Sequence, residues 1–266
     1  PDGDQPMETV TAILVAVAGL VLGSFFNVVI YRLPRGLNLS RPPSACPGCG
    51  GRIKPYDNVP VLSYLLLRGK CRRCGKKISP VYPAVEALTA AGFVLVYFVG
   101  AGRTLGAEFF AGCLFTSALI VLGFIDYYHQ VLPDAVTMPG LVLALAYAFF
   151  RDDLTFRGAL LGAVLGSGFL LLVYGAYYLV RKKEGLGMGD VTMMLMVGAF
   201  LGPLRTLLVL ILASFVGAAV GLFLVRRRGK DLQFALPFGT FIAPAAFVAL
   251  LWGERIVRAY LALYKR

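Results

Sequence analysis

Charged side chains are scarce in this sequence of 266 residues. They make up 15% of it, against roughly 25% in an ordinary soluble domain, and only 14 residues are Asp or Glu. Hydrophobic residues reach 58%, and the mean hydropathy is +0.76. So few charges cannot cover so much apolar surface in water. The composition therefore excludes a soluble domain, a coiled coil and a disordered chain, and it indicates a protein that crosses a membrane several times.

Several catalytic and binding motifs are also missing. His129 is the only histidine, so a Ser-His-Asp arrangement has no good candidate. The glycine-rich segment 185–190 lacks the Lys-Ser/Thr of a P-loop and follows no Rossmann strand, which makes nucleotide binding a weak interpretation. The basic segment 32–80 lacks the interleaved aromatic residues of a nucleic-acid-binding helix. Acidic side chains and cysteines remain as candidates for chemistry.

Long stretches without charge predict about eight transmembrane helices in an all-α protein. A straight crossing needs about 20 residues, and the sixth run, with 14, is the least secure. Pro237 and Pro244 are expected to break the first part of the last run, and the first run is too long for a signal peptide. The runs are 9–31, 87–102 (beginning near Val81), 109–125, 135–150, 158–180, 191–204, 206–225 and 232–253.

The distribution of Lys and Arg predicts the orientation of these helices. With eight spans, the segments 32–80, 181–183 and 226–230 lie on one side with 18 Lys or Arg, against 8 on the other. The basic side is expected to be cytoplasmic, next to anionic lipid, with both termini outside. A seven-span arrangement with a re-entrant sixth run would place 226–230 outside, and the charge rule disfavours it.

These boundaries divide the chain into segments. Residues 1–6 precede Met7 and are interpreted as an expression remnant, with a genuine polar N-terminal tail as the alternative. Residues 7–31 form the first transmembrane helix, 32–80 a small cytoplasmic domain, and 81–266 the remaining helical domain.

Four of the five cysteines form two C-x-x-C pairs, Cys46/Cys49 and Cys71/Cys74. Two such pairs complete the tetrahedron that zinc prefers, and glycines follow both pairs, as tight metal-binding turns require. A redox dithiol or two disulfides are the alternative, although a cytoplasmic location argues against disulfides. Four protein ligands leave no open position, so the sequence predicts a structural zinc ion. Cys113 is interpreted as a small core residue.

Two carboxylates are expected at the cytoplasmic ends of transmembrane helices. Asp126 ends the third run and Asp190 opens the sixth, after Gly187 and Gly189, which permit close backbone approach. Of two apposed carboxyl groups in a poor dielectric, one keeps its proton and the other stays charged, which suits aspartyl-protease chemistry. Helix capping is the alternative for Asp190. 

Three further ionisable residues have simpler interpretations. Asp134 is interpreted as a helix N-cap. Glu86, about one turn inside the second span, is given a structural role, although it also suits a polar cavity. His129 is interpreted as a loop hydrogen-bonding residue rather than an acid–base group.

At this point the sequence resembles the type IV prepilin peptidases, bifunctional leader peptidase/N-methyltransferases of the GxGD class of intramembrane aspartyl proteases. The resemblance covers residues 20–250. Besides the paired cysteines, it rests on the motifs GSFFNVVIYRLP, DNVPVLSYLLLRGKC, ISPVYPAVE, IDYYHQVLPD, KEGLGMGD and LPFGTFIAP, at 23–34, 57–71, 78–86, 125–134, 183–190 and 236–244.

The resemblance implies a bacterial inner-membrane enzyme with its active site on the cytoplasmic side. Asp126 and Asp190 would be the catalytic pair, cutting after a glycine at the end of a short basic leader of a prepilin or pseudopilin. The new N-terminus, usually Phe, would then be methylated with S-adenosylmethionine. Gly23, Asn27, Arg32 and Glu86 are candidates for binding that cofactor. The sequence departs from the family at Thr192, where Lys is common, and at Thr240, where Pro is common.

Two other functions are weighed. A transporter whose carboxylates bind protons or ions should show internal repeats, and none relates the two halves. A zinc-containing assembly factor would leave the two aspartates unexplained. If the enzyme interpretation holds, a basic leader meets a basic protein face, so local contacts to Glu86 or Glu184 are expected to help bind it.

Overall fold

The computed structural model describes residues 5–182, 187–228 and 237–264, and nearly all of them are helical or in turns. The two β-bridges found in these ranges, Ala45↔Arg52 and Lys70↔Lys77, are isolated. The chain divides into two compact units, Pro1–Ser117 and Ala118–Arg266. The α-helices are α1 Gln5–Arg32, α2 Leu62–Leu66, α3 Val81–Leu95, α4 Ala107–His129, α5 Asp134–Tyr147, α6 Phe156–Arg181, α7 Met188–Leu201, α8 Pro203–Arg228 and α9 Gly239–Tyr264.

The all-α membrane architecture predicted from the sequence is confirmed. Every one of the eight charge-free runs coincides with an apolar helix, namely α1 and α3 to α9. Six helices in the described ranges have the length and hydropathy to cross a membrane, whereas α5 and α7 have only 14 residues each. A π-helical segment, Val96–Gly100, extends α3 to the length of a span.

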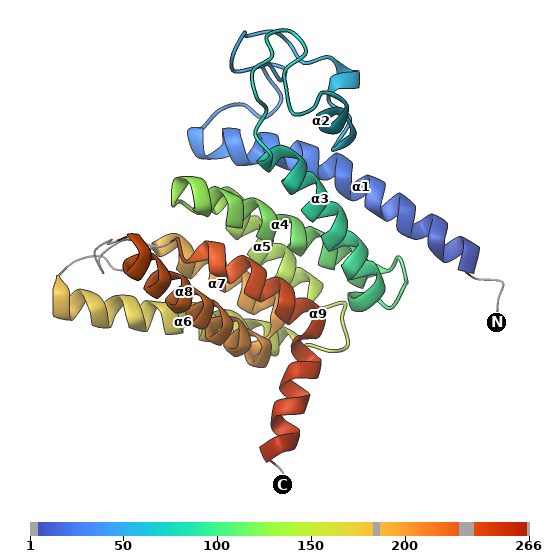
Figure 1. Cartoon of the computed structure of the whole chain (residues 1–266). Helices are drawn as coiled ribbons and strands as arrows, with labels where there is room; N and C mark the ends of the chain where they lie inside the picture. Colours follow the sequence, from blue (N-terminus) through green and yellow to red (C-terminus); the bar gives the residue numbers. More distant parts are fainter. Residues whose placement is uncertain (1–4, 183–186, 229–236, 265–266) are drawn as a thin grey trace. The chain divides into compact units, whose positions relative to one another are not determined.

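In the first unit, α1 and α3 pack side by side (Figure 1). Two glycines of α1 make this close packing possible. A Cβ on Gly19 would lie 2.6 Å from the Cα of Ala90, and one on Gly23 would lie 2.7 Å from the Cα of Glu86. Small residues at a helix contact let the backbones approach, which is how helices associate in a membrane, where lipid is as apolar as the side chains.

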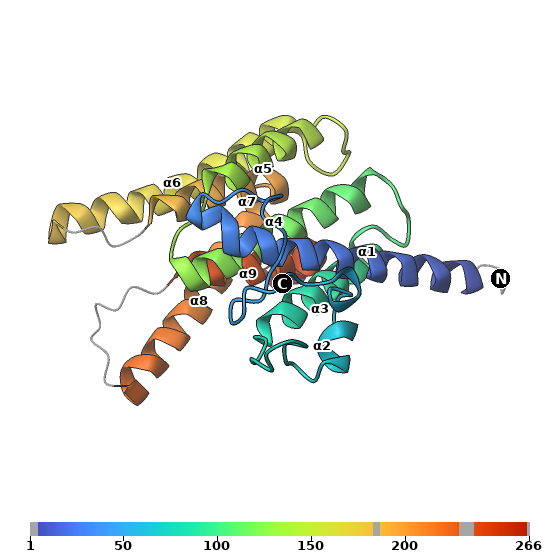
Figure 2. The same ribbon diagram turned by 90° about the horizontal axis from the view of Figure 1, so that it is seen from above.

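In the second unit, α7 is the central helix and packs against α5, α6, α8 and α9 (Figure 2). It is apolar all round, and Met193, Met194, Met196 and Val197 are almost fully buried. A helix of this length is about 21 Å long, short of the ~30 Å hydrocarbon core. Neighbouring helices, rather than lipid, cover most of α7, so it does not have to match the thickness of the bilayer.

The contact between α6 and α7 depends on two glycines. A Cβ placed on Gly162 would overlap the backbone of Gly198, and a Cβ on Gly198 would overlap the backbone of Gly162. The two helices therefore meet backbone to backbone at this point.

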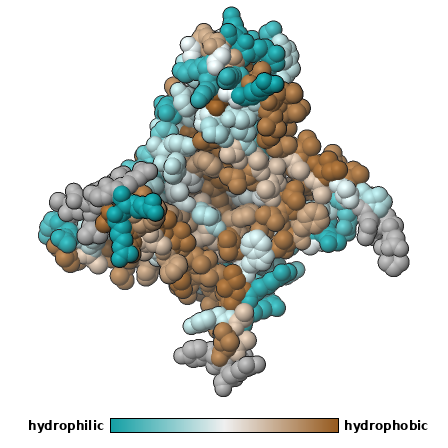
Figure 3. All heavy atoms as spheres, in the orientation of Figure 1, coloured by the Kyte–Doolittle hydropathy of each residue, from teal (hydrophilic) through white to brown (hydrophobic). Residues whose placement is uncertain are grey.

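The outer surfaces of the helices are hydrophobic, as expected where lipid is the solvent. Leu172, Val180 and Phe215 are among the exposed apolar side chains. Figure 3 shows brown, hydrophobic surface over much of the helices, while the region of the paired cysteines is largely teal and hydrophilic.

The structure differs from the sequence predictions at helix ends. Pro244 does not break the last helix but lies inside α9, which begins at Gly239. Asp134 is the first residue of α5, and Pro133, rather than Asp134, occupies the N-cap position. Within the segment 1–6, Gln5 already belongs to α1.

Candidate active site and metal centre

Asp126 lies in the last turn of α4, and only 4% of its surface is exposed. Its Oδ2 atom accepts a hydrogen bond from the backbone N–H of Thr240, with 2.7 Å between nitrogen and oxygen. The Thr240 hydroxyl lies 3.1 Å from the same oxygen. Because Thr240 is in the first turn of α9, the carboxylate sits where the N–H groups of that helix have no partner within the helix.

Asp190 lies in the first turn of α7 and is 7% exposed. It interacts electrostatically with Asp126, and the backbone N–H of Gly239 acts electrostatically on both carboxyl groups. Its Oδ1 atom is buried and has no hydrogen-bond partner among the described residues. The two aspartates, 64 positions apart in the sequence, are thus brought together, and Oδ1 of Asp190 is a buried oxygen without a donor in the described part of the chain.

Glycines surround this pair of carboxyl groups. A Cβ on Gly239 would lie 3.0 Å from Oδ2 of Asp126, and a Cβ on Gly187 would lie 3.3 Å from Oδ2 of Asp190. A Cβ on Gly189 would lie 2.8 Å from the Cβ of Leu132. Side chains at Gly239 or Gly189 would therefore push α9 or α7 away from the site.

Sequence reasoning identified Gly187 and Gly189 but missed Gly239 and the contacts of Thr240. The available signal was weak. Gly239 and Thr240 follow Pro237 at the start of an apolar run, a pattern typical of a helix N-terminus. The pattern does not indicate which side chain contacts that N-terminus.

Thr192 also lies near the site, one turn after Gly189. Its hydroxyl donates to the carbonyl oxygen of Gly189 at 3.0 Å, and the hydroxyl of Thr137 on α5 lies 3.4 Å from it. Thr192 therefore bonds within the first turn of α7 rather than presenting a charge.

The four paired cysteines form one cluster in the first unit. Their sulfur atoms all lie within 4.8 Å of one another, and the Sγ atoms of Cys46 and Cys74 are 3.8 Å apart. Zinc–sulfur bonds of about 2.3 Å place tetrahedral thiolates about 3.8 Å apart, whereas a disulfide needs about 2.05 Å. The donor set and its spacing fit a tetrahedral metal ion and do not fit disulfides. All four cysteines are free thiols.

Each C-x-x-C pair forms the same backbone turn. The N–H of Gly50 bonds to the carbonyl oxygen of Cys46, and the N–H of Gly75 bonds to that of Cys71, each at 2.9 Å. Gly50 and Gly75 have φ values of 66° and 69°, a region that favours glycine. The backbone N–H groups of Gly48 and Cys49 lower the pKa of the Cys46 thiol to about 6, which favours the thiolate that a metal needs.

The residues proposed from the sequence to bind a cofactor make contacts within the first unit. Asn27 donates to the carbonyl oxygen of Tyr82 at 3.0 Å and so joins α1 to α3. Arg32 donates to the carbonyl oxygens of Asn38, Leu39 and Pro42 and fixes the chain after α1. Gly23 lies against α3, as described above.

Glu86 is buried in α3 and connects that helix to the cysteine region. Its Oε2 atom accepts a hydrogen bond from the backbone N–H of Val61 at 2.7 Å, and Ser24 of α1 also bonds to its carboxyl group. The contacts of Glu86 are those of a structural residue. Glu184, the other residue expected to contact a leader, lies outside the described residues.

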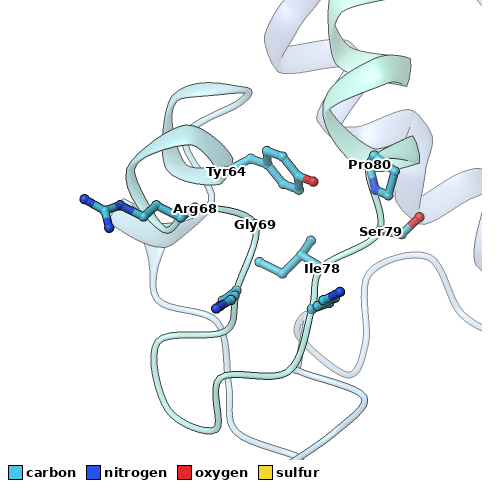
Figure 4. A pocket seen from close by; sticks show the side chains of 8 residues that line it. Tyr64, Arg68, Gly69, Ile78, Ser79 and Pro80 are labelled. Carbon is cyan, nitrogen blue, oxygen red and sulfur yellow. The ribbon is translucent and has the colours of Figure 1, made fainter.

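An open pocket of about 400 Å³ lies beside the cysteine cluster in the first unit. It is lined by Tyr64, Arg68, Gly69, Lys70, Lys77, Ile78, Ser79 and Pro80. Figure 4 shows Tyr64 and Ile78 directed into it, whereas the Arg68 side chain points away from both. The side chains therefore do not converge on a single anion position.

Comparison with known proteins places these features in a family. The model of the bacterial peptidase A24 N-terminal domain matches residues 17–99, and that of the type IV leader peptidase family matches residues 113–222. A prepilin leader peptidase/N-methyltransferase of Pseudomonas putida is 39% identical over 94% of this chain and 93% of its own length. Proteins of the same name from Pseudomonas aeruginosa and Aeromonas hydrophila are 40% and 38% identical, covering 91% and 93% of this chain and the same shares of their own lengths. No solved structure matches.

Proposed function

Because this chain belongs to the type IV leader peptidase family, we propose that it removes the leader of a prepilin or pseudopilin and then methylates the new N-terminal amine. The cut follows a glycine, and S-adenosylmethionine supplies the methyl group. The observation that carries the peptidase activity is the burial of both Asp126 and Asp190, together with the electrostatic interaction between their carboxyl groups.

The environments of the two carboxyl groups support different roles for them. Asp126 accepts hydrogen bonds from the backbone N–H and the hydroxyl of Thr240, and these donors stabilise its ionised form. Asp190 has a buried oxygen without a donor, which suits a protonated carboxyl group. Asp126 is therefore the base and Asp190 the acid.

The reaction then needs only these two groups and a water molecule. Asp126 takes a proton from the water as its oxygen attacks the peptide carbon, and Asp190 gives its proton to the carbonyl oxygen. In the second step Asp126 returns a proton to the leaving nitrogen, and Asp190 regains one from the tetrahedral hydroxyl as the C–N bond breaks. Both carboxyl groups end in their starting states.

The cysteine cluster is proposed to hold a structural zinc ion through Cys46, Cys49, Cys71 and Cys74. Zinc would fix the two C-x-x-C turns against each other. Gly23, Asn27, Arg32 and Glu86 are proposed to support methyl transfer from the α1–α3 pair, since their contacts favour positioning over direct contact with S-adenosylmethionine.

The proposed location is the bacterial inner membrane, with the aspartates and the cysteine cluster on the cytoplasmic side. The excess of Lys and Arg in 32–80, 181–183 and 226–230 supports this orientation. The apolar helix surfaces support entry of the substrate's hydrophobic helix from the bilayer.

The test is to incubate the purified protein in detergent with a prepilin-like substrate and S-adenosylmethionine, and to read the products by mass spectrometry. The wild type is expected to remove the leader and to add one methyl group. Asp126→Asn and Asp190→Asn, which preserve the shape of each side chain, are expected to cleave nothing.

A substrate supplied without its leader separates the two activities. Both variants should still methylate it, which shows that they are folded. Asp134→Asn is the matched control, because it removes a carboxylate from the adjacent start of α5 and should still cleave. Cleavage by either catalytic variant would contradict the proposal.

A further inference from the structure

The start of α9 places two hydrogen-bond donors of Thr240 on one oxygen of Asp126. The backbone N–H lies 2.7 Å from Oδ2 and the side-chain Oγ1 lies 3.1 Å from it. Any residue other than proline supplies the first donor, whereas the second needs a hydroxyl. The side chain of Thr240 therefore adds a second hydrogen-bond donor to Oδ2, which the backbone of α9 alone does not supply.

The hydroxyl has a second acceptor within reach. Oγ1 lies 3.4 Å from the carbonyl oxygen of Gly123, one turn earlier on α4. A hydroxyl carries a single hydrogen, so it serves one acceptor at a time. It favours the charged carboxylate while Asp126 is ionised, since hydrogen bonds to ionised acceptors are the stronger ones. It can turn to the Gly123 carbonyl once Asp126 holds a proton.

From this geometry we propose that Thr240 is the positioning residue for Asp126. Its hydroxyl selectively stabilises the ionised carboxylate and fixes Oδ2, leaving Oδ1 as the oxygen that Thr240 does not engage. This inference rests on the proposed function, because it describes how the base of that reaction is held ready.

Few other groups titrate near this carboxyl. Among the described residues, α7 contributes Asp190, while the contacts from α9 are uncharged donors. On α4 itself His129 lies three positions along, together with Tyr127 and Tyr128. The fall in cleavage rate at low pH, here called the acidic limb of the pH profile, is therefore assigned to the aspartate pair. The variant His129→Gln serves as a background in which the imidazole cannot contribute to that limb.

The experiment measures kcat and KM for prepilin cleavage against pH for Thr240→Val, Thr240→Ser and the wild type. Valine has nearly the shape of threonine and removes only the hydroxyl. Loss of one hydrogen bond to a charged group changes its ionisation equilibrium about tenfold or somewhat more. Thr240→Val is therefore expected to move the acidic limb to higher pH by about one unit and to lower kcat below that limb about tenfold, while KM changes little.

Thr240→Ser keeps a hydroxyl and is expected to restore the wild-type limb, which a merely structural role of the methyl group would not do. Thr240→Pro removes both donors at a position in the first helical turn where proline is tolerated, and it should move the limb furthest. Melting temperatures of all variants show whether they are folded. The shift produced by Thr240→Val should persist in the His129→Gln background.

The outcomes separate this inference from the proposed function. If Asp126→Asn is inactive and folded Thr240→Val keeps the wild-type limb and kcat, the role of Thr240 is wrong while the aspartate pair stands. If Thr240→Ser behaves like Thr240→Val, the hydroxyl is not the cause, and the inference is again overturned. If Asp126→Asn still cleaves, the proposed catalytic pair itself fails.

Discussion

Glu86 of α3 accepts a hydrogen bond from the backbone N–H of Val61, with 2.7 Å between Oε2 and nitrogen. Val61 precedes α2 and has a φ of 58°, a strained conformation for a β-branched residue. The buried carboxyl group therefore holds a strained turn of the cysteine region against a transmembrane helix. This contact accounts for a charged side chain inside the α1–α3 pair.

Removal of this carboxyl group should loosen the turn. Glu86→Ala leaves the N–H of Val61 without its acceptor, and we expect the free energy of unfolding to fall by about 1–3 kcal/mol. Glu86→Gln keeps an acceptor oxygen and should lose less. Thermal unfolding in detergent measures both, and an Ala variant as stable as the wild type would show that the contact contributes nothing.

The same pair of variants tests the cofactor role expected for Glu86. If its function is structural, folded Glu86→Gln should bind S-adenosylmethionine with an affinity close to that of the wild type, as measured by calorimetry. A large loss of affinity in a folded Gln variant would instead place Glu86 in the cofactor site.

The metal should stabilise the cysteine region more than the aspartate site. Cys71→Ser removes one of four ligands, and because structural zinc contributes folding free energy directly, we expect loss of bound zinc and a lower melting temperature. Methylation should fall more than cleavage. Cys113→Ser is the control, since Cys113 lies outside the cluster. Zinc content by mass spectrometry and the two activities check this, and equal loss of both activities in a folded protein would contradict it.

The contact between Gly162 and Gly198 should tolerate no added methyl group. Gly162→Ala forces a Cβ into the backbone of α7, and overpacking of this kind costs about 1–3 kcal/mol. Gly168→Ala on the same helix is the control, because a Cβ there has no neighbour within 4 Å. In thermal unfolding, the melting temperature of Gly162→Ala should lie well below that of Gly168→Ala. Equal melting temperatures would refute the close approach of α6 to α7.

A pH effect on stability is expected at the loop between α5 and α6. Arg151 and Arg205 lie 2.5 and 2.9 Å from Oδ2 of Asp153, and hydrogen bonding to Arg151 chiefly lowers the pKa of that carboxyl group. The stabilisation is present above the unfolded pKa of about 3.9 and is lost as pH falls through the lower folded value. The side chain is 50% exposed, so the effect is at most about 1 kcal/mol.

Asp153→Asn tests this contribution. It should lower the melting temperature at pH 7 and bring it closer to that of the wild type as the pH approaches 3. Asp152→Asn removes the same charge from the same loop but leaves both arginine contacts of Asp153 in place. A difference between Asp153→Asn and the wild type that does not depend on pH would contradict the ion-pair explanation.

The sequence predicted those features that depend on local patterns. The eight helices follow from runs of apolar residues, and the cysteine cluster follows from the spacing of Cys46, Cys49, Cys71 and Cys74 with their glycines. Both signals are carried by neighbouring residues, and they survive in the fold because each run or turn forms its own backbone hydrogen bonds.

Contacts between distant residues could not be predicted in the same way. Thr240 meets Asp126 across 114 positions, and Glu86 meets Val61 across 25. Both pairings depend on how helices pack, which apolar periodicity does not specify when a helix is hydrophobic all round, as α7 is. The rule that proline breaks helices predicts a break at Pro244, yet Pro244 lies inside α9, because transmembrane helices tolerate proline where neighbouring groups satisfy the freed backbone.

The central claim is that Asp126 and Asp190 act as one unit, and a double-mutant comparison tests it most directly. Catalytic groups that depend on one another are strongly non-additive, so each single substitution removes nearly all the activity that the pair provides. We predict that Asp126→Asn, Asp190→Asn and the double variant are equally inactive, each leaving prepilin cleavage at the background rate of the substrate alone. If the fold-losses in cleavage rate of the two single variants multiply, so that the double variant is far slower than either, the two carboxyl groups act independently. That result would contradict the account.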